Sequence, residues 1–187
     1  MTRCAWPAND PLMIKYHDTE WGVPLHDDQK LFEFMVLDAF QAGLSWRTVL
    51  YKRENFRHAF DNFDYKKIAG YNGSKYELLL TDAGIIRNRA KINAAIVNAQ
   101  KFMDIQKEFG SFNKYIWQFT GGKPKVNRWK NISQIPAKST ESDAMSRDLT
   151  RRGFKFAGST ICYAFMQAAG LVNDHLTSCF RYKELNI

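Results

Sequence analysis

Apolar side chains recur every three or four residues along most of this chain, which is the period of an amphipathic α-helix. Residues that cap or stop helices divide the pattern into segments. No pair of alternating strands joined by a hairpin dipeptide is visible, and no internal repeat is visible either. The sequence therefore predicts an all-α fold, with helices over residues 11–16, from Asp27 or Asp28 to Gly43, from Ser45 to about Phe60, over 75–81, through Ile92–Met103, from Ser111 onward, and near 141–152 and 159–169.

The turn at residues 82–88 stands out among the helix connections, because a glycine and two β-branched residues lead directly into a helix. Backbone N–H groups at such a helix start are a natural seat for a phosphate. A plain helix–helix connection would have a similar sequence. The basic side chains of Arg87, Arg89 and Lys91 favour a helix–hairpin–helix element over about residues 75–103. Such an element would hold a DNA backbone without reading bases. The DNA contacts predicted here are Gly84, Arg87, Arg89 and Lys91.

Length and composition indicate a globular protein of one domain, or one domain with a compact lobe, because 187 residues with 45% hydrophobic side chains bury a substantial core. The first residues contain no apolar stretch typical of a signal peptide. No run approaches the ~18 apolar residues of a membrane span. Three cysteines give no even disulfide framework. We therefore expect the protein to be in the cytoplasm, where thiols stay reduced.

The net charge of +8 is unevenly distributed. Residues 1–60 hold seven Lys/Arg against eight Asp/Glu, a balance of −1, and residues 61–187 hold 20 against 11, a balance of +9. Between Phe109 and Thr140 there are six basic residues and no acidic one, with Tyr115, Trp117 and Trp129 among them. Such a composition favours a polyanionic partner such as nucleic acid, although many basic proteins bind none.

The residues best suited to bind a metal lie at the two ends of the chain. Cys4 and His17 are near the start, and His175 and Cys179 are near the finish with three residues between them. Two thiolates and two imidazoles suit a closed tetrahedral Zn²⁺ site. If His175 and Cys179 occupy one helical turn, their side chains share a face. One bound ion would then join the two chain ends, which otherwise fray.

A second interpretation of these residues needs no metal: Cys4 would be a free surface thiol and His17 a hydrogen-bonded loop residue. His26 and His58 have no thiol nearby and are interpreted as ordinary polar residues. Cys162 lies within the apolar run 161–166 and is interpreted as a small buried hydrophobe.

Aromatic residues and one carboxylate are grouped near the start of the chain. Asp38 lies in an apolar stretch, where an ionised group is unfavourable unless it is paired or functional. It has the alternative of facing solvent from one flank of its helix. The aromatic residues either complete a core or surround a pocket with Asp38, and three of them neighbour predicted metal ligands; they are Trp6, Tyr16, Trp21 and Trp46.

Collinear blocks along essentially the whole chain resemble the type I 3-methyladenine DNA glycosylases. The blocks are Cys4–Trp6, Asp10–Pro11, Tyr16–Asp18, Glu20–Pro24, Gln41–Trp46, Lys52–Phe56, Gly84–Arg87, Arg152–Phe156 and Gly170–His175. The resemblance implies a helix–hairpin–helix glycosylase fold as a single unit, residues 1–187. It implies a lobe formed by about 1–25 and 105–187, held by one structural Zn²⁺ whose ligands are Cys4, His17, His175 and Cys179.

The resemblance also implies the activity and its site. The enzyme would be a monomer that acts on double-stranded DNA containing alkylated purines and excises 3-methyladenine by hydrolysis of the N-glycosidic bond. Tyr16 and Trp46 would contact the flipped base, and Trp6 would lie near the sugar. Trp21 is predicted to bind the substrate as well. Gln41 and Leu44 would fill the gap in the duplex. No lysine is evident in the pocket segments, so we expect no strand cleavage.

This chain departs from the family pattern at Asp38, the predicted catalytic carboxylate, where the family has a glutamate. An aspartate keeps the charge but is shorter by one methylene, so its reach falls by over ~1 Å. A hydrogen bond stretched by that much is largely lost. A backbone shift or a bridging water would compensate for the shorter reach; the alternative is a different preferred lesion.

Two other functions are compatible with the same residues. One is a non-catalytic zinc protein that binds DNA or its lesions. The other is a zinc hydrolase or deaminase in which His17, His175 and Cys179 hold the ion and a water takes the fourth position.

Overall fold

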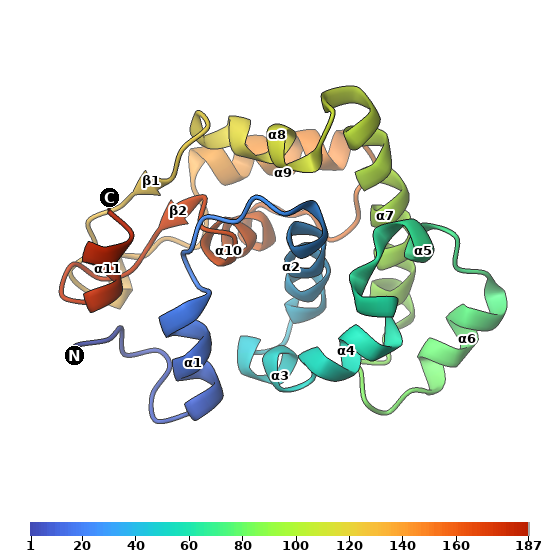
Figure 1. The fold of residues 1–187 in the computed structure, drawn as a ribbon, viewed down its shortest axis with the longest axis horizontal. Coiled ribbons are helices and arrows are strands. Elements are labelled where there is room, and N and C mark those ends of the chain that lie inside the picture. The colour runs from blue at the N-terminus through green and yellow to red at the C-terminus, as the bar shows by residue number, and fades with distance from the viewer. Residues whose placement is uncertain (187) are drawn as a thin grey trace.

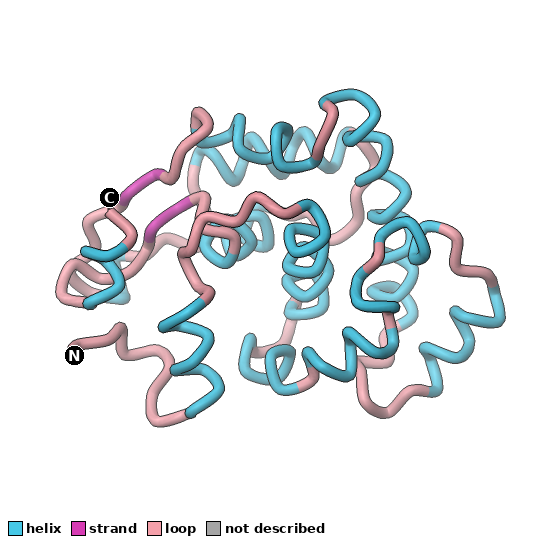
Figure 2. Tube along the Cα trace, viewed as in Figure 1, coloured by secondary structure: helices cyan, strands magenta, loops and turns pink. Residues whose placement is uncertain are grey.

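The computed structural model describes residues 1–186, and it confirms a mostly helical chain (Figures 1 and 2). Ile187, the last residue of the predicted C-terminal lobe, lies outside the described residues. The α-helices are α1 (Pro11–Thr19), α2 (Asp28–Gln41), α3 (Trp46–Tyr51), α4 (Arg53–Ala59), α5 (Tyr65–Ala69), α6 (Gly73–Thr81), α7 (Arg89–Phe109), α8 (Phe112–Trp117), α9 (Thr140–Arg151), α10 (Ser159–Ala168) and α11 (Phe180–Glu184). Short 3-10 helices are η1 (Asp61–Phe63), η2 (Gln118–Thr120) and η3 (Ile132–Gln134), and the strands are β1 (Lys125–Val126) and β2 (Val172–Asn173).

Helix α2 lies at the centre of the fold (Figure 1). All residues from Leu31 to Phe40 are buried, so no flank of this stretch faces solvent. A helix buried all round must be surrounded by other elements, and α3, α7, α8 and α10 pack against it. The periodic pattern predicted that the apolar side chains would line one face of this helix. They are buried on all sides instead, because these neighbours cover the whole circumference.

The predicted capping residues are confirmed where helices begin. The Asp10 carboxylate accepts hydrogen bonds from the backbone N–H groups of Leu12 and Met13 at 3.0 and 3.1 Å. Asp27 caps α2. Asp28 instead accepts from two N–H groups at the start of α8, which ties α8 to α2.

One prediction of the local structure was wrong. The helix expected from Ser45 to Phe60 is divided into α3 and α4 at Lys52. Both halves present apolar side chains inward, so periodicity alone did not reveal the break. The chain also contains a small parallel pairing, Lys125 with Val172 and Val126 with Asn173. Strands of two residues are too short to produce a visible alternation.

The two chain ends lie on the same side of the molecule (Figure 1). The backbone N–H of Phe180 donates to the carbonyl of Thr2 at 2.9 Å, which joins the ends directly. Near them, Gly170 lies against the loop after α1: a Cβ added to Gly170 would come within 2.3 Å of the Val23 carbonyl carbon. Only a glycine permits this approach of two backbones.

No helix within residues 1–186 is long and apolar enough to span a membrane.

Candidate active site and metal centre

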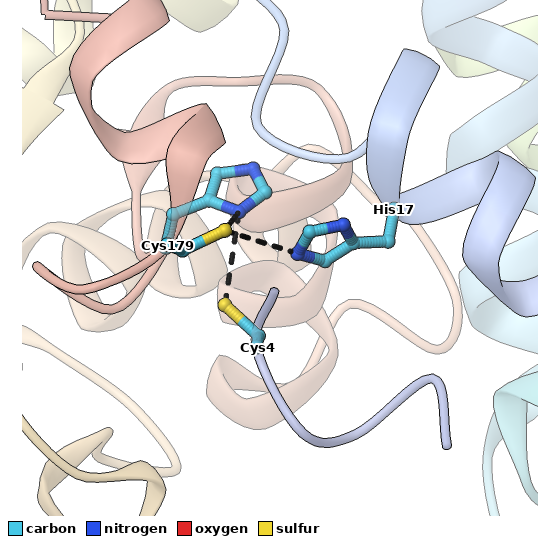
Figure 3. Close-up of side chains that lie close together, drawn as sticks. Cys4, His17 and Cys179 are labelled. Carbon is cyan, nitrogen blue, oxygen red and sulfur yellow. Dashed lines mark hydrogen bonds between the residues drawn. The ribbon is translucent and has the colours of Figure 1, made fainter. Parts of the chain in front are cut away.

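Cys4, His17, His175 and Cys179 converge in one buried cluster. Their ligand atoms all lie within 4.8 Å of one another. Cys179 Sγ is 3.5 Å from His17 Nε2 and 3.6 Å from His175 Nδ1, and Cys4 Sγ is 3.8 Å from His175 Nδ1. Ligands that share one zinc ion tetrahedrally are separated by roughly 3.3–3.8 Å. Figure 3 shows Cys4, His17 and Cys179 pointing toward a common centre. The donor set and its spacing therefore fit a metal ion.

The other nitrogen of each imidazole has its own partner. His17 Nδ1 is 2.7 Å from the Asp18 carboxylate, which Arg3 binds in turn. His175 Nε2 is 2.9 Å from the carbonyl oxygen of Trp21. Such partners orient a metal-binding histidine and leave its free nitrogen aimed at the ion. In addition, the backbone N–H of Leu176 is 3.4 Å from Cys4 Sγ.

Burial sets the protonation of these groups. It lowers the pKa of His17 and lowers the pKa of His175 to about 4, so both rings are neutral, as metal ligands must be. Burial also raises the pKa of the Cys4 thiol to about 12. A thiolate there requires a cation beside it.

The sequence-based geometry of His175 and Cys179 was wrong, although the structure brings the two residues together. They do not share a helical turn, because α11 begins only at Phe180. A tight turn brings the two residues together instead, with the Cys179 N–H donating to the Leu176 carbonyl at 2.7 Å. Cys4 is buried, which excludes the interpretation of a surface thiol.

The remaining histidines and cysteine lie apart from the cluster. His26 is exposed, contacts Asn113 and stacks on Trp117. His58 is exposed on α4. Cys162 is buried on α10, as predicted.

A pocket of about 350 Å³ opens beside the cluster. This volume lies in the usual range of small-molecule sites. Four aromatic side chains and one carboxylate line it, contributed by the N-terminal segment, α1, the loop after α1, α2 and α3: Trp6, Tyr16, Trp21, Asp38 and Trp46. The structure therefore brings together the five residues that the sequence associated with a base pocket.

The aromatic rings contact one another and the metal cluster. The Tyr16 and Trp46 rings are 5.1 Å apart, and those of Trp6 and Trp21 are 5.2 Å apart. Trp6 lies 5.4 Å from the His17 ring, and Trp21 lies 4.6 Å from the His175 ring. The walls of the pocket are thus held partly by the side chains of the cysteine–histidine cluster.

Asp38 is the carboxylate of this pocket. Its side chain belongs to the buried stretch of α2 and is 3% exposed, so it does not face solvent. Burial raises the pKa of Asp38 well above its usual range. One carboxylate oxygen is buried with no hydrogen-bond partner, as are the indole N–H groups of Trp6 and Trp46. Unpaired buried polar atoms are rare, and three in one pocket indicate a polar ligand.

Gln41 and Leu44 lie where α2 turns into α3. Gln41 lines the pocket. Leu44 is 44% exposed, unusual for a large apolar side chain. These positions place both residues at the pocket mouth or just outside it.

The turn between α6 and α7 is fixed to the rest of the fold. The Lys52 ammonium donates to the carbonyls of Ala83 and Gly84, and the Asn55 amide donates to that of Gly84. A Cβ on Gly84 would lie 3.2 Å from Asn55 and 2.9 Å from Asp82. Arg87 and Arg89 remain exposed at the start of α7.

Lys91 does not share that exposed surface. Its side chain is buried, and the ammonium donates to the carbonyls of Phe40 and Ala42 at 2.8 and 2.6 Å. These carbonyls belong to the end of α2, where a cation is favourable. Burial lowers the pKa of Lys91. This placement disagrees with the direct DNA contact predicted for Lys91, because its charge is used inside the protein.

Comparison with known proteins gives the family. The model of the methyladenine glycosylase family matches residues 6–182. This chain belongs to that family. DNA-3-methyladenine glycosylase 1 of Escherichia coli (strain K12) is 50% identical over 182 residues, 97% of this chain and 97% of that protein.

Solved structures agree with this assignment to the methyladenine glycosylases. A crystal structure of 3-methyladenine DNA glycosylase I matches with a TM-score of 0.93 at 50% identity, over 96% of this chain and 98% of that one. A tyrosine-to-phenylalanine variant of 3-methyladenine DNA glycosylase I, solved in complex with 3-methyladenine, matches with a TM-score of 0.93 at 36% identity, over 96% of this chain and 97% of that one.

Sequence reasoning missed several residues that line the pocket of this methyladenine glycosylase. Gln167 on α10 is one, and its polarity within the apolar run 161–169 was a signal that could have found it. Ile132 and Ile135 form the wall around η3. They lie in a segment without helical period, so the sequence held no indication of their position.

Proposed function

We propose that this protein is a monofunctional DNA glycosylase that removes 3-methyladenine from alkylated double-stranded DNA, acting as a monomer in the cytoplasm. The observation that supports this most strongly is the aromatic pocket around the unpaired carboxylate of Asp38. The relative that is 50% identical over nearly the whole chain is named for the same activity.

The chemistry of the lesion suits such a pocket. Methylation at N3 makes the adenine cationic, so the glycosidic bond is already weakened and the base leaves as a neutral molecule. Little acid catalysis is then required. The protein must instead turn the nucleotide out of the stack, bind the charged base, and stabilise the sugar cation that develops as the bond breaks.

The aromatic walls favour a cationic base. The faces of Tyr16 and Trp46 attract positive charge, and burial holds the pKa of Tyr16 well above its usual range, so its phenol stays neutral. We assign Tyr16 and Trp46 to the base, and Trp6 with Trp21 to the region near the sugar.

Asp38 adds discrimination by charge. In the free pocket its protonated form is favoured, because burial raises its pKa. A cationic base bound nearby favours the carboxylate and gains an attraction that a neutral purine does not. The carboxylate also accepts hydrogen bonds from the adenine edge and faces the positive charge that develops on the sugar.

Strand cleavage is not part of this proposal, because among the described residues no lysine lines the pocket. A Schiff-base step requires an amine at the reacting sugar. Water therefore completes the reaction and leaves an intact strand with an abasic site.

DNA is held by two parts of the fold in this proposal. The α6–α7 turn, with Gly84, Arg87 and Arg89, acts as a helix–hairpin–helix element that binds phosphates through backbone N–H groups and exposed cations. Gln41 and Leu44 fill the space that the extruded nucleotide leaves. Lys91 supports the end of α2 and is not among these contacts.

We further propose that the cluster of Cys4, His17, His175 and Cys179 binds one structural Zn²⁺. Four buried protein ligands support a closed site rather than one with an open position for water. The ion would hold α1 against the end of the chain and so keep the pocket walls in place. X-ray absorption of the purified protein is expected to show two sulfur and two nitrogen ligands, and an exchangeable oxygen ligand would favour a zinc hydrolase.

The activity is tested with methylated duplex DNA. We expect release of free 3-methyladenine and abasic sites without nicks. Asp38→Asn should lower the single-turnover rate by at least about 100-fold, and Asp38→Glu, which keeps the charge, should retain activity within about tenfold. If wild-type protein binds methylated DNA but releases no base, the non-catalytic alternative is correct.

A further inference from the structure

The connection from β1 to α9, residues 127–139, forms one wall of the pocket without belonging to a long helix. It lies beside α11, on the other side of α1 and α2 from the α6–α7 turn (Figure 1). Its residues Ile132 and Ile135 line the pocket, with Gln41 and Trp46 contributed by other elements. A connection that contains Arg128, Lys130 and Lys138 therefore borders the pocket.

The first part of this connection is anchored by a buried carboxylate, Asp174. Asp174 is 1% exposed and accepts hydrogen bonds from four neutral donors. Asn127 Nδ2 and Trp129 Nε1 each lie 2.7 Å from one oxygen, and Tyr163 and Gln167 donate to the other at 2.7 and 2.8 Å. A carboxylate with all its partners in place fixes the chain that donates to it. The connection is thus rigid at Trp129, immediately before the pocket wall.

The next residues present an apolar side chain to solvent. Ile132 is 50% exposed, although it lines the pocket. The Gln134 side chain accepts from the backbone N–H groups of Lys130 and Asn131 at 2.7 and 3.0 Å, which closes the 3-10 turn around Ile132. A β-branched residue held rigidly at a pocket mouth indicates a contact surface rather than an unused loop.

Cations directly precede this residue. Arg128 and Lys130 are exposed, and among the described residues they make no ion pair. Two other cations of this region are paired: Lys125 with Glu141 and Lys138 with Asp143. No acidic residue occurs between residues 109 and 140. Unpaired cations beside an apolar side chain suit a polyanion that also offers an apolar surface, which is the chemistry of a nucleotide extruded from DNA.

We propose that residues 128–135 form a third DNA-contacting segment, across the pocket mouth from the turn between α2 and α3. Arg128 and Lys130 bind the phosphates that flank the extruded nucleotide. Ile132 packs against the sugar of that nucleotide and keeps it in the pocket. This inference rests on the proposed glycosylase function, because it requires that the pocket receive a nucleotide from a duplex.

The cations are tested by the salt dependence of binding. We expect the Arg128→Gln/Lys130→Gln double variant to bind an abasic-analogue duplex more weakly at every salt concentration. The slope of log K against log salt should fall by about 2, one per phosphate contact. The matched control is Lys66→Gln/Lys67→Gln, which removes the same charge from exposed positions of α5. Its slope should equal that of the wild type.

Ile132 is tested by comparing duplex DNA with free base. We expect Ile132→Ala to lower single-turnover excision from methylated duplex about tenfold and to lower the affinity for free 3-methyladenine much less. Ile132→Val, which keeps a branched side chain, should retain most of the single-turnover excision rate.

These readouts separate failure of the inference from failure of the function. Wild-type protein that releases no 3-methyladenine from methylated duplex would overturn the proposed function itself. If the wild type releases 3-methyladenine from methylated duplex, but the double variant keeps the wild-type slope or Ile132→Ala keeps the wild-type rate, residues 128–135 do not contact DNA as proposed.

Discussion

Asp38 and Glu33 lie on the same buried stretch of α2, but their surroundings differ in charge. Glu33 accepts hydrogen bonds from Arg53 at 2.5 Å and from Arg57 at 3.0 Å. Asp38 has no cationic partner, and one of its oxygens is unpaired. The first carboxylate is neutralised within the fold. The second is left to be neutralised by a proton or by a cationic ligand, which is the property that the proposed reaction uses.

This difference has a consequence for stability. Because burial raises the pKa of Asp38 above the unfolded value of about 3.9, the folded protein binds more protons at this site than the unfolded chain does. The contribution of Asp38 to stability is therefore fully present below about pH 4 and is lost as the pH rises through the folded pKa. We expect Asp38→Asn to have a larger free energy of unfolding than the wild type at pH 8, by an amount that shrinks toward pH 4.

Urea unfolding over a pH series measures this difference. Asp104→Asn is a suitable control, because Asp104 is exposed and Lys101 and Lys107 lower its pKa. The Asp104→Asn substitution should give no increase in the free energy of unfolding at high pH. A difference between Asp38→Asn and wild type that is the same at pH 4 and pH 8 would show that the pKa of Asp38 is not raised.

At the scale of elements, the basic residues at the start of α7 have two different roles. Arg87 and Arg89 are exposed, whereas Lys91 binds the end of α2. We expect Arg87→Gln/Arg89→Gln to reduce the salt slope of DNA binding by about 2 with little change in stability. Lys91→Gln should instead lose about 1–3 kcal/mol of stability, because two carbonyls lose a charged partner, and it should keep the wild-type slope.

Anisotropy titrations and urea unfolding of both variants measure the two effects. A reduced slope for Lys91→Gln would place its ammonium at the DNA after all, and an unchanged slope for the double arginine variant would remove the α6–α7 turn from the DNA-binding surface.

The contact between the loop after α1 and the end of α10 depends on Gly170. Gly170 has φ of +71°, and an added Cβ would lie 2.3 Å from the Val23 backbone. Gly121 has a similar φ of +69° but open space around it. We expect Gly121→Ala to destabilise by about 1–2 kcal/mol through backbone strain alone. Gly170→Ala should lose at least about 2 kcal/mol more, because two backbones must separate.

Thermal and urea unfolding of the two alanine variants test this prediction, and equal losses would contradict it. Since Gly170 lies close to β2 and the metal ligands, Gly170→Ala is also expected to reduce metal content, whereas Gly121→Ala is not.

At the scale of the whole molecule, the proposed zinc ion connects residues that are more than 150 positions apart. We expect chelation to lower the melting temperature, because the binding free energy of a structural metal contributes to folding. It should also weaken the binding of free 3-methyladenine by at least about tenfold, because Trp6 and Trp21 contact the ligand histidines.

Metal analysis, thermal unfolding and base binding of Cys179→Ser and Cys162→Ser complete this test. Cys162 is buried but lies outside the cluster, so its variant should keep one metal ion per chain. A metal-free wild type that binds base normally would contradict the proposed role of the ion.

Much of this architecture was predictable from the sequence. Helix periodicity and capping residues such as Asp10 act over a few positions, so they are visible without knowledge of the fold. The division of residues 45–60 at Lys52 was not predictable, because both halves have an apolar face.

The residue types in the candidate site were equally visible. The four proposed metal ligands are the cysteines and histidines near the chain ends, and their chemistry distinguishes them. The sequence could not indicate in which direction a side chain points in the folded protein. Lys91 appeared to belong with Arg87 and Arg89, but packing turned it toward α2. Asp38 had an apolar neighbourhood in either orientation, and only the full enclosure of α2 decided its burial.

The sequence by itself therefore determined the helices, the ligand set and the family resemblance, because these depend on local period and on the identity of side chains. The tertiary structure alone decided that aromatic rings from separate segments face one unpaired carboxylate. It also decided that Ile132 and Gln167 complete the pocket. The physical reason is that a pocket arises where elements distant in the chain pack together, and the burial, pKa and partners of each side chain follow from that packing.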